Sequence, residues 1–230
     1  MIPGLYKDSK LIITWEDLKV KNLIKENNNV LYELSKDIRG KLVFPEDFKI
    51  IIYGAFKNTK ISEVVLPQNT SGINSGAFLG SNLNNFTVPK KCVTIHENAF
   101  KDCKNLEKID LKNVFNIKSS AFEGSGIKDI ELSKVSSFGK DIFKDCKNLQ
   151  SITLPEMFFC LDDIFGSDTS KPIFYKGKRE ILNKILKDED NNVTVPYNFI
   201  CKDDTLEKLI ENGCSYKEIN NILKKDFWER

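Results

Sequence analysis

A pair of residues, Ala or Ile followed by Phe, recurs at near-constant intervals through the middle of the chain. Successive phenylalanines of these pairs lie 22, 22, 22, 21 and 22 residues apart, at Phe56, Phe78, Phe100, Phe122, Phe143 and Phe165. A fixed period of roughly 20 to 50 residues indicates a solenoid, in which each unit buries its apolar face against the next. The spacing therefore predicts a stack of similar coils.

Each interval carries two further apolar features. A large apolar residue stands four positions before each of the first five pairs, at Ile51, Ile73, Ile95, Ile117 and Phe138. A second apolar set begins five or six residues after each phenylalanine, and its last two members are separated by one residue, as in Ile109 and Leu111. Residues two apart lie on the same face of a strand, so each coil is expected to contain one short strand. Several of these strands end at a proline, which cannot donate to a sheet: Pro45, Pro67, Pro89 and Pro155.

Two units show the pattern most fully. Residues 98–111 and 142–155 share the Phe pair, a Cys-Lys-Asn-Leu turn and the following apolar positions in register. These residues resemble the BspA-like leucine-rich repeat family, and the match runs from about Leu42 to about Phe165. The resemblance implies a curved solenoid used for binding, often in surface or adhesive proteins, and it implies no catalytic residues. The expected fold is a right-handed leucine-rich repeat solenoid of about six 22-residue coils over residues 42–176.

The two ends leave the repeat pattern and are expected to cap the apolar ends of the stack. In residues 1–41, two apolar stretches around Lys7–Lys10 suggest a hairpin, and Thr14 resembles a helix start. In residues 177–230 the apolar spacing becomes helical, and Ser215 with Glu218 three residues later forms a capping box. We therefore expect an N-terminal cap and a C-terminal α-helical cap.

Charge argues against nucleic acid as the main partner. The chain has 35 basic and 33 acidic residues, and only Arg39, Arg179 and Arg230 are arginine. A balanced chain has little nonspecific attraction to polyanions, and arginine is the usual choice for bidentate phosphate recognition. The alternative rests on residues 212–219, which resemble the first two helices of a helix-turn-helix unit, but the segment from Lys176 onward has no net charge.

The cysteines and the single histidine do not form a catalytic or metal-binding pattern. No two cysteines have zinc-knuckle spacing, and Cys103 and Cys146 occupy the same place in coils two apart, roughly 10 Å from each other. They are interpreted as buried thiols, with Cys201 and Cys214 the one pair worth testing for a disulfide. His96 is expected to be a solvated surface residue. We therefore expect no enzyme activity, no cofactor and no metal.

The strands predict a binding face. If the apolar residues of each strand point inward, their neighbours point outward and form two columns on a rigid sheet. The predicted partner-binding residues are Val43, Glu63, Val65, Asn85, Thr87, Lys108, Asp110, Asp129, Glu131 and Thr153. Asp110 and Glu131 would receive a basic side chain, while Val43 and Val65 would supply apolar contact. The predicted function is non-enzymatic protein recognition, for adhesion, scaffolding or inhibition by blocking.

No stretch approaches eighteen consecutive apolar residues, and the first eight residues lack the pattern of a secretory signal. The expectation is a cytoplasmic protein that does not insert into membranes. The alternative is a cell-surface or secreted protein from which an export signal was removed.

Overall fold

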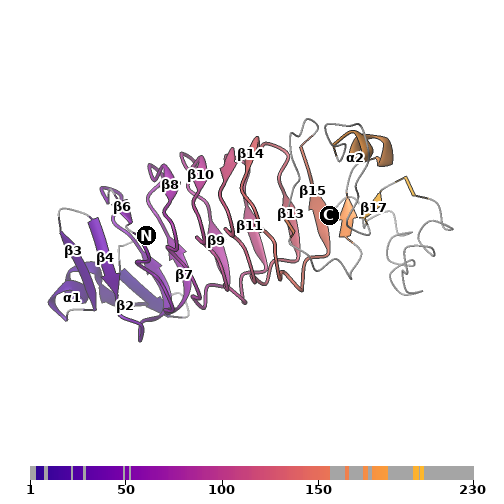
Figure 1. Ribbon diagram of the computed structural model, residues 1–230. Helices are drawn as coiled ribbons and strands as arrows, with labels where there is room; N and C mark the ends of the chain where they lie inside the picture. Colours follow the sequence, from indigo (N-terminus) through magenta and orange to yellow (C-terminus); the bar gives the residue numbers. More distant parts are fainter. Residues whose placement is uncertain are drawn as a thin grey trace.

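The chain folds as a stack of coils that follow one another along a long axis (Figure 1). The computed structural model describes residues 4–7, 10–21, 23–27, 30–48, 50–51, 53–155, 164–165, 173–175, 178–185, 199–201 and 203–204. The predicted solenoid is confirmed, but it has about five turns where about six coils were expected. None of the helices in these ranges has the length and apolar character needed to cross a membrane.

The strands predicted from the second apolar set of each coil form one side of the stack. A six-stranded sheet has the order β11 (Lys108–Asp110), β9 (Asn85–Thr87), β7 (Lys60–Val65), β5 (Arg39–Val43), β1 (Gly4–Lys7) and β2 (Lys10–Thr14). A second sheet continues it with β13 (Asp129–Glu131), β15 (Ser151–Thr153), β16 (Ile173–Tyr175) and β17 (Phe199–Cys201). Parallel pairing places equivalent residues side by side, such as Asn85 opposite Lys108 and Asp129 opposite Ser151. Within each sheet, residues of the two expected columns therefore lie side by side.

The apolar residue four positions before each Phe pair lies on a second row of strands, visible on the other side of the coils in Figure 1. These are β8 (Gly72–Ile73), β10 (Thr94–Ile95), β12 (Asn116–Ile117) and β14 (Ser137–Phe138), which pair in parallel as one sheet. A fourth sheet holds β3 (Ile24–Asn27), β4 (Val30–Leu34) and β6 (Ile50–Ile51). Each repeat thus crosses the stack twice as a strand.

The phenylalanines of the repeated pairs form a continuous column through the core. Phe78 stacks on Phe56 and on Phe100 with ring centroids 4.6 and 5.2 Å apart and interplanar angles of 5° and 2°. Phe100 and Phe122 follow at 5.4 Å, and all four side chains are fully buried. The backbone N–H of Phe78 donates to the Ala99 carbonyl of the next coil at 2.8 Å, and the same bond recurs from coil to coil. Core packing and backbone hydrogen bonding therefore both run along the axis.

The Phe pairs lie between two sharp turns in each coil. The backbone is left-handed two residues before each of the first five Phe residues, at Gly54, Gly76, Asn98, Ser120 and Asp141, and again two residues after it, at Asn58, Gly80, Asp102, Gly124 and Asp145. Glycine adopts this region without steric cost, and Asn and Asp tolerate it better than other residues. The small and polar residues around each pair are therefore required by the turns.

The coils differ in length at the second turn. Eight residues separate Phe122 from Ile130 at the centre of its strand, whereas nine separate Phe100 from Ile109. The extra residue is accommodated in the Cys-Lys-Asn turn, where the N–H of Lys104 donates to the Asp102 carbonyl at 2.9 Å. The shorter turn of residues 124–126 lies between two longer ones, where a hollow of about 550 Å³ opens. The strand ladder is interrupted at the same place, between β11 and β13.

The N-terminal segment matches its predicted elements. β1 and β2 form the expected antiparallel hairpin, and the Thr14 Oγ1 accepts a hydrogen bond from the Asp17 N–H at 3.2 Å to begin α1 (Trp15–Val20). The ring of Trp15 packs against Phe44 and Phe48 with centroids 4.7 and 5.3 Å away. A second hairpin, β3 with β4, was not predicted.

The helical C-terminal cap is not confirmed. The helix α2 (Arg179–Ile185) lies within the predicted segment, but β17 pairs in parallel with β16 and carries the sheet to residue 201. A strand connection therefore extends past residue 176, where the helical spacing was expected to replace it. The capping box at Ser215, the helix-turn-helix-like residues 212–219 and Cys214 lie outside the described residues.

Candidate functional site

A groove of about 780 Å³ lies across the outward side of β9, β11, β13 and β15, which we call the recognition face. In three of these strands the central residue is buried and its two neighbours are exposed: Phe86, Ile109 and Ile130 are the buried ones. Six of the ten predicted binding residues line the groove: Asn85, Thr87, Lys108, Asp110, Asp129 and Glu131. The buried apolar residues hold each strand in place, so the backbone that carries the outward side chains is rigid.

The remaining predicted residues lie beyond the groove. Glu63 and Val65 are half-buried on β7, and the Glu63 Oε1 is 2.6 Å from the Nζ of Lys41. Thr153 is half-buried on β15. The expectation that Val43 is available to a partner is wrong, because its side chain is only 4 % exposed. Val43 lies opposite Gly4 in the pairing of β5 with β1, so the N-terminal hairpin closes this end of the column.

Hydroxyl groups hold two of the groove carboxylates. The Ser133 Oγ donates to the Glu131 Oε1 at 3.0 Å, and the Ser151 Oγ donates to the Asp129 Oδ1. Ser151 itself is buried. These hydrogen bonds restrict the rotamers of Asp129 and Glu131.

Asp110 has a cationic neighbour within the groove. Its Oδ2 lies 3.0 Å from the Nζ of Lys112, and both side chains are mostly exposed. The hydrogen bond and the charge of Asp110 raise the pKa of Lys112, and the nearby Glu131 carboxylate adds to this effect. Lys112 is therefore firmly protonated at neutral pH, and the groove contains charges of both signs.

The thiol of Cys103 is buried, as predicted, whereas that of Cys146 is half-buried. The Cys103 Sγ donates to the Phe78 carbonyl at 3.0 Å, and the equivalent Cys146 Sγ donates to the Phe122 carbonyl at 3.0 Å. Burial raises the pKa of Cys103 to about 12 and that of Cys146 to about 11, so neither thiol is ionised at neutral pH. Cysteines 92, 103, 146 and 201 are free, whereas Cys160 and Cys214 lie outside the described residues.

His96 lies away from the groove. It follows β10 on the second row of strands and is half-buried rather than fully solvated. Its backbone N–H donates to the Ile73 carbonyl of the preceding coil at 2.9 Å. The groove lining contains no histidine and no cysteine.

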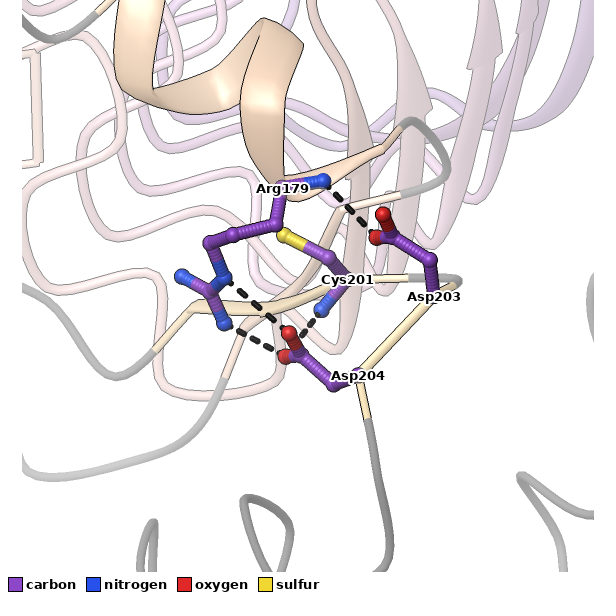
Figure 2. A network of polar contacts seen from close by, with 4 residues as sticks. All are labelled: Arg179, Cys201, Asp203 and Asp204. Carbon is purple, nitrogen blue, oxygen red and sulfur yellow. Dashed lines mark hydrogen bonds and ion pairs between the residues drawn. The ribbon is translucent and has the colours of Figure 1, made fainter.

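A polar cluster joins α2 to β17, and sequence reasoning missed it (Figure 2). The guanidinium of Arg179 pairs with the Asp204 carboxylate, and its Nε donates to the Asp204 Oδ1 at 3.0 Å. The backbone N–H of Arg179 donates to the Asp203 Oδ1 at 2.7 Å, and that of Cys201 donates to the Asp204 Oδ2 at 2.7 Å. The Arg179 contacts link residues 24 or 25 positions apart, so no local sequence motif indicates them.

Cys201, Asp203 and Asp204 also bring three potential metal-binding atoms within 4.8 Å of one another. Both carboxylates already accept hydrogen bonds from Arg179, and a cation would have to replace this positive charge. Burial raises the pKa of Cys201 to about 12, which keeps its thiol protonated. The Arg179, Asp203 and Asp204 contacts therefore fasten the start of α2 to the end of β17, and we call them the Arg179 clamp.

Comparison with known proteins agrees with this architecture. Among solved structures, a leucine-rich repeat protein from T. pallidum is 24% identical, with a TM-score of 0.55 over 61% of this chain and 72% of that one. A leucine-rich repeat protein from Bacteroides ovatus is 22% identical with a TM-score of 0.49, and the match covers 59% of this chain but only 37% of that one. The pneumococcal vaccine antigen PcpA is 18% identical with a TM-score of 0.46, over 80% of this chain and 54% of that one.

The T. pallidum structure supports the solenoid fold and, at this identity, the fold alone. No curated protein matches the chain. The sequence pattern of the BspA type leucine rich repeat region, in contrast, matches residues 28–150 in 6 copies. This match covers more than half of the 230 residues. The chain therefore belongs to the BspA type leucine-rich repeat family.

Proposed function

We propose that the protein is a non-enzymatic recognition module that binds a protein partner through the recognition face. The observation that carries the proposal is the groove of about 780 Å³ over β9, β11, β13 and β15, lined by six of the residues that the repeat pattern places outward. Families with this repeat commonly mediate protein–protein interaction, and the comparisons indicate no catalytic family. Adhesion, scaffolding and inhibition by blocking would all use this same surface.

The physical support is the rigidity of the face. Phe86, Ile109 and Ile130 are anchored in a core whose rings stack from coil to coil, and the strand residues between them have little freedom. A partner that meets pre-positioned side chains loses less conformational entropy on binding than one that must order a loop. A standard interface buries about 800 Å² on each partner, so the partner would also contact the loops that border the groove.

The test is a steric block of the recognition face. Thr87 is exposed in the groove, and Thr87→Trp should weaken capture of the native partner at least tenfold in a quantitative pull-down, while the circular dichroism spectrum stays unchanged. Val93→Trp is the matched control, because Val93 is 42% exposed and precedes β10 on the second row of strands, outside the groove. Equal capture of one partner by the wild type and both variants would refute the proposed function.

A further inference from the structure

Four successive turns that join the two rows of strands carry positive charge and no negative charge. They lie between β7 and β8, β9 and β10, β11 and β12, and β13 and β14, at residues 66–71, 88–93, 111–115 and 132–136. Their charged residues are four exposed lysines: Lys90, Lys91, Lys112 and Lys134. The turns follow one another from coil to coil, so the lysines lie along one edge of the stack. We call these four turns the basic edge.

Two apolar side chains are exposed at the same edge. Val93 is 42% exposed and Phe115 is 44% exposed. The backbone N–H of Phe115 donates to the Val93 carbonyl at 3.0 Å, so the two residues lie side by side in adjacent coils. The same ladder continues to Ser71 on one side and to Ser136 on the other. Because serine occupies this place in both neighbouring coils, the turn itself does not require an apolar residue, and the exposed pair favours a binding role.

The charge of the basic edge is only partly compensated. Among the described residues, Lys112 pairs with Asp110, whereas the other three lysines form no ion pair. Asp110 and Glu131 border the edge on the groove side, and the four lysines exceed these two carboxylates by two positive charges. Further carboxylates occur at Glu97, beyond β10, and in the turn of the preceding coil, residues 44–48. The edge is therefore a local positive patch on a chain whose net charge is only +2.

This combination fits an anionic lipid surface. Successive coils are about 4.8 Å apart, so the four turns form a ridge about 15 Å long. Val93 and Phe115 line neither of the two hollows described above, so they lie on an open edge rather than in a cleft. Lysine is a point charge without the planar fork of arginine, and clusters of lysine are attracted to a diffuse layer of anionic headgroups. Apolar side chains beside such lysines can enter the boundary between the headgroups and the acyl chains.

We propose that the basic edge is a second binding surface, which docks on a membrane that contains anionic lipid. The lysine ammonium groups lie among the headgroup phosphates, and Val93 and Phe115 enter the boundary with the acyl chains. The edge runs from coil to coil, so the solenoid lies lengthwise on the membrane without spanning it. Lys90 and Lys91 are outside the groove, which leaves the recognition face beside the membrane rather than under it.

The first test is co-sedimentation of the full chain with lipid vesicles at low ionic strength. One set of vesicles is phosphatidylcholine alone, and the other is phosphatidylcholine and phosphatidylglycerol in equal parts. The chain should bind the anionic vesicles at least about tenfold more tightly, and salt should weaken this preference by screening the lysines. Equal binding to both sets, or no binding to the anionic set at about 1 mM lipid, would overturn the inference. Tighter binding to an oligothymidylate than to the anionic vesicles would assign the edge to nucleic acid and overturn it as well.

Paired charge reversals test the position of the site. Lys90→Glu with Lys91→Glu should weaken binding to the anionic vesicles at least about 25-fold, because each lysine near an anionic leaflet contributes about fivefold. Lys57→Glu with Lys104→Glu is the matched control, because both lysines are exposed in the turns that follow the Phe pairs, away from the basic edge. The control changes the net charge equally and should weaken binding less than about threefold. Equal losses in the two variants would show that net charge alone governs binding, contrary to the inference.

The apolar contribution has its own variant and control. Phe115→Ala should weaken binding to the anionic vesicles about fivefold, since part of an aromatic side chain no longer leaves water. Tyr53→Ala removes a side chain that is 72% exposed outside the basic edge and should leave binding unchanged. Equal binding by these two variants would contradict the inference.

The two surfaces can be tested separately. Neither Lys90 nor Lys91 lines the groove, so the variant with both lysines reversed should still capture the native protein partner as the wild type does. Loss of vesicle binding with intact capture supports a membrane site distinct from the recognition face. Loss of capture with unchanged vesicle binding would contradict the inference.

Discussion

Removal of one ring from the phenylalanine column should destabilise the protein strongly. Phe100 is fully buried, and its ring lies parallel to those of Phe78 and Phe122 at 5.2 and 5.4 Å, with Phe86 tilted against it at 5.1 Å. Phe→Ala changes in cores cost about 3 to 5 kcal/mol, including the cavity that remains. Each aromatic pair adds about 0.5 to 1.5 kcal/mol beyond burial, so Phe100→Ala should cost about 5 kcal/mol.

The assay is urea unfolding followed by circular dichroism, with Phe115→Ala as the control. Phe115 is 44% exposed, and its removal should cost less than about 1 kcal/mol. Because Phe100 couples two neighbouring coils, its loss is also expected to lower the apparent m-value as the stack begins to unfold in parts. If Phe100→Ala costs no more than Phe115→Ala, the column does not hold the coils together and the reasoning is refuted.

Three further changes test other parts of the stack. A Cβ on Gly126 would lie 2.8 Å from the Lys104 carbonyl carbon, so Gly126→Ala should lower the free energy of unfolding by about 1 to 3 kcal/mol in the same assay. Gly72→Ala is the control: its Cβ would lie 3.5 Å from the nearest atom, the Thr94 carbonyl oxygen, and should cost less than about 1 kcal/mol. Burial raises the pKa of Cys103 from 9.0 to about 12, so the unfolded chain loses this proton at a lower pH than the folded chain. Between pH 9 and 12, the free energy of unfolding of the wild type should therefore fall relative to that of Cys103→Ala by about 1.4 kcal/mol per pH unit. Arg179→Met leaves the Asp204 carboxylate, which is 4% exposed, without its cation. The local stability should fall by about 3 kcal/mol, so amide hydrogen exchange should accelerate in β17 but not in β9. Equal acceleration in both strands would contradict a local role for this ion pair.

The sequence predicted the features that the repeat itself creates. The spacing of Phe56 to Phe165 identified the stack, and the one-residue separation of Ile109 and Leu111 identified the strands. In a stack, ladder pairing places equivalent residues side by side, so the outward columns could be read directly from the period. The six groove residues were predictable for this reason.

Other features depend on contacts between segments that do not share the repeat. Val43 has the outward position of its column, but the N-terminal hairpin pairs with β5 there and the side chain is buried. Helical spacing around Ile181 did not indicate that β17 continues the sheet. The Arg179 clamp joins a helix to residues after that strand, and nothing in its local sequence signals the contact.

The bonds between coils have a mechanical consequence. The backbone bonds from Phe56 to Ala77 and from Phe78 to Ala99 both join one coil to the next, so tension applied between residues near the two ends of the stack acts on them in series. A coil of 22 residues that leaves the stack frees roughly 75 Å of extended chain while shortening the stack by only about 5 Å. Under load the protein should therefore lengthen in steps of about 70 Å, which single-molecule stretching would record as a regular series. Under force, the solenoid should therefore extend by unfolding one coil at a time.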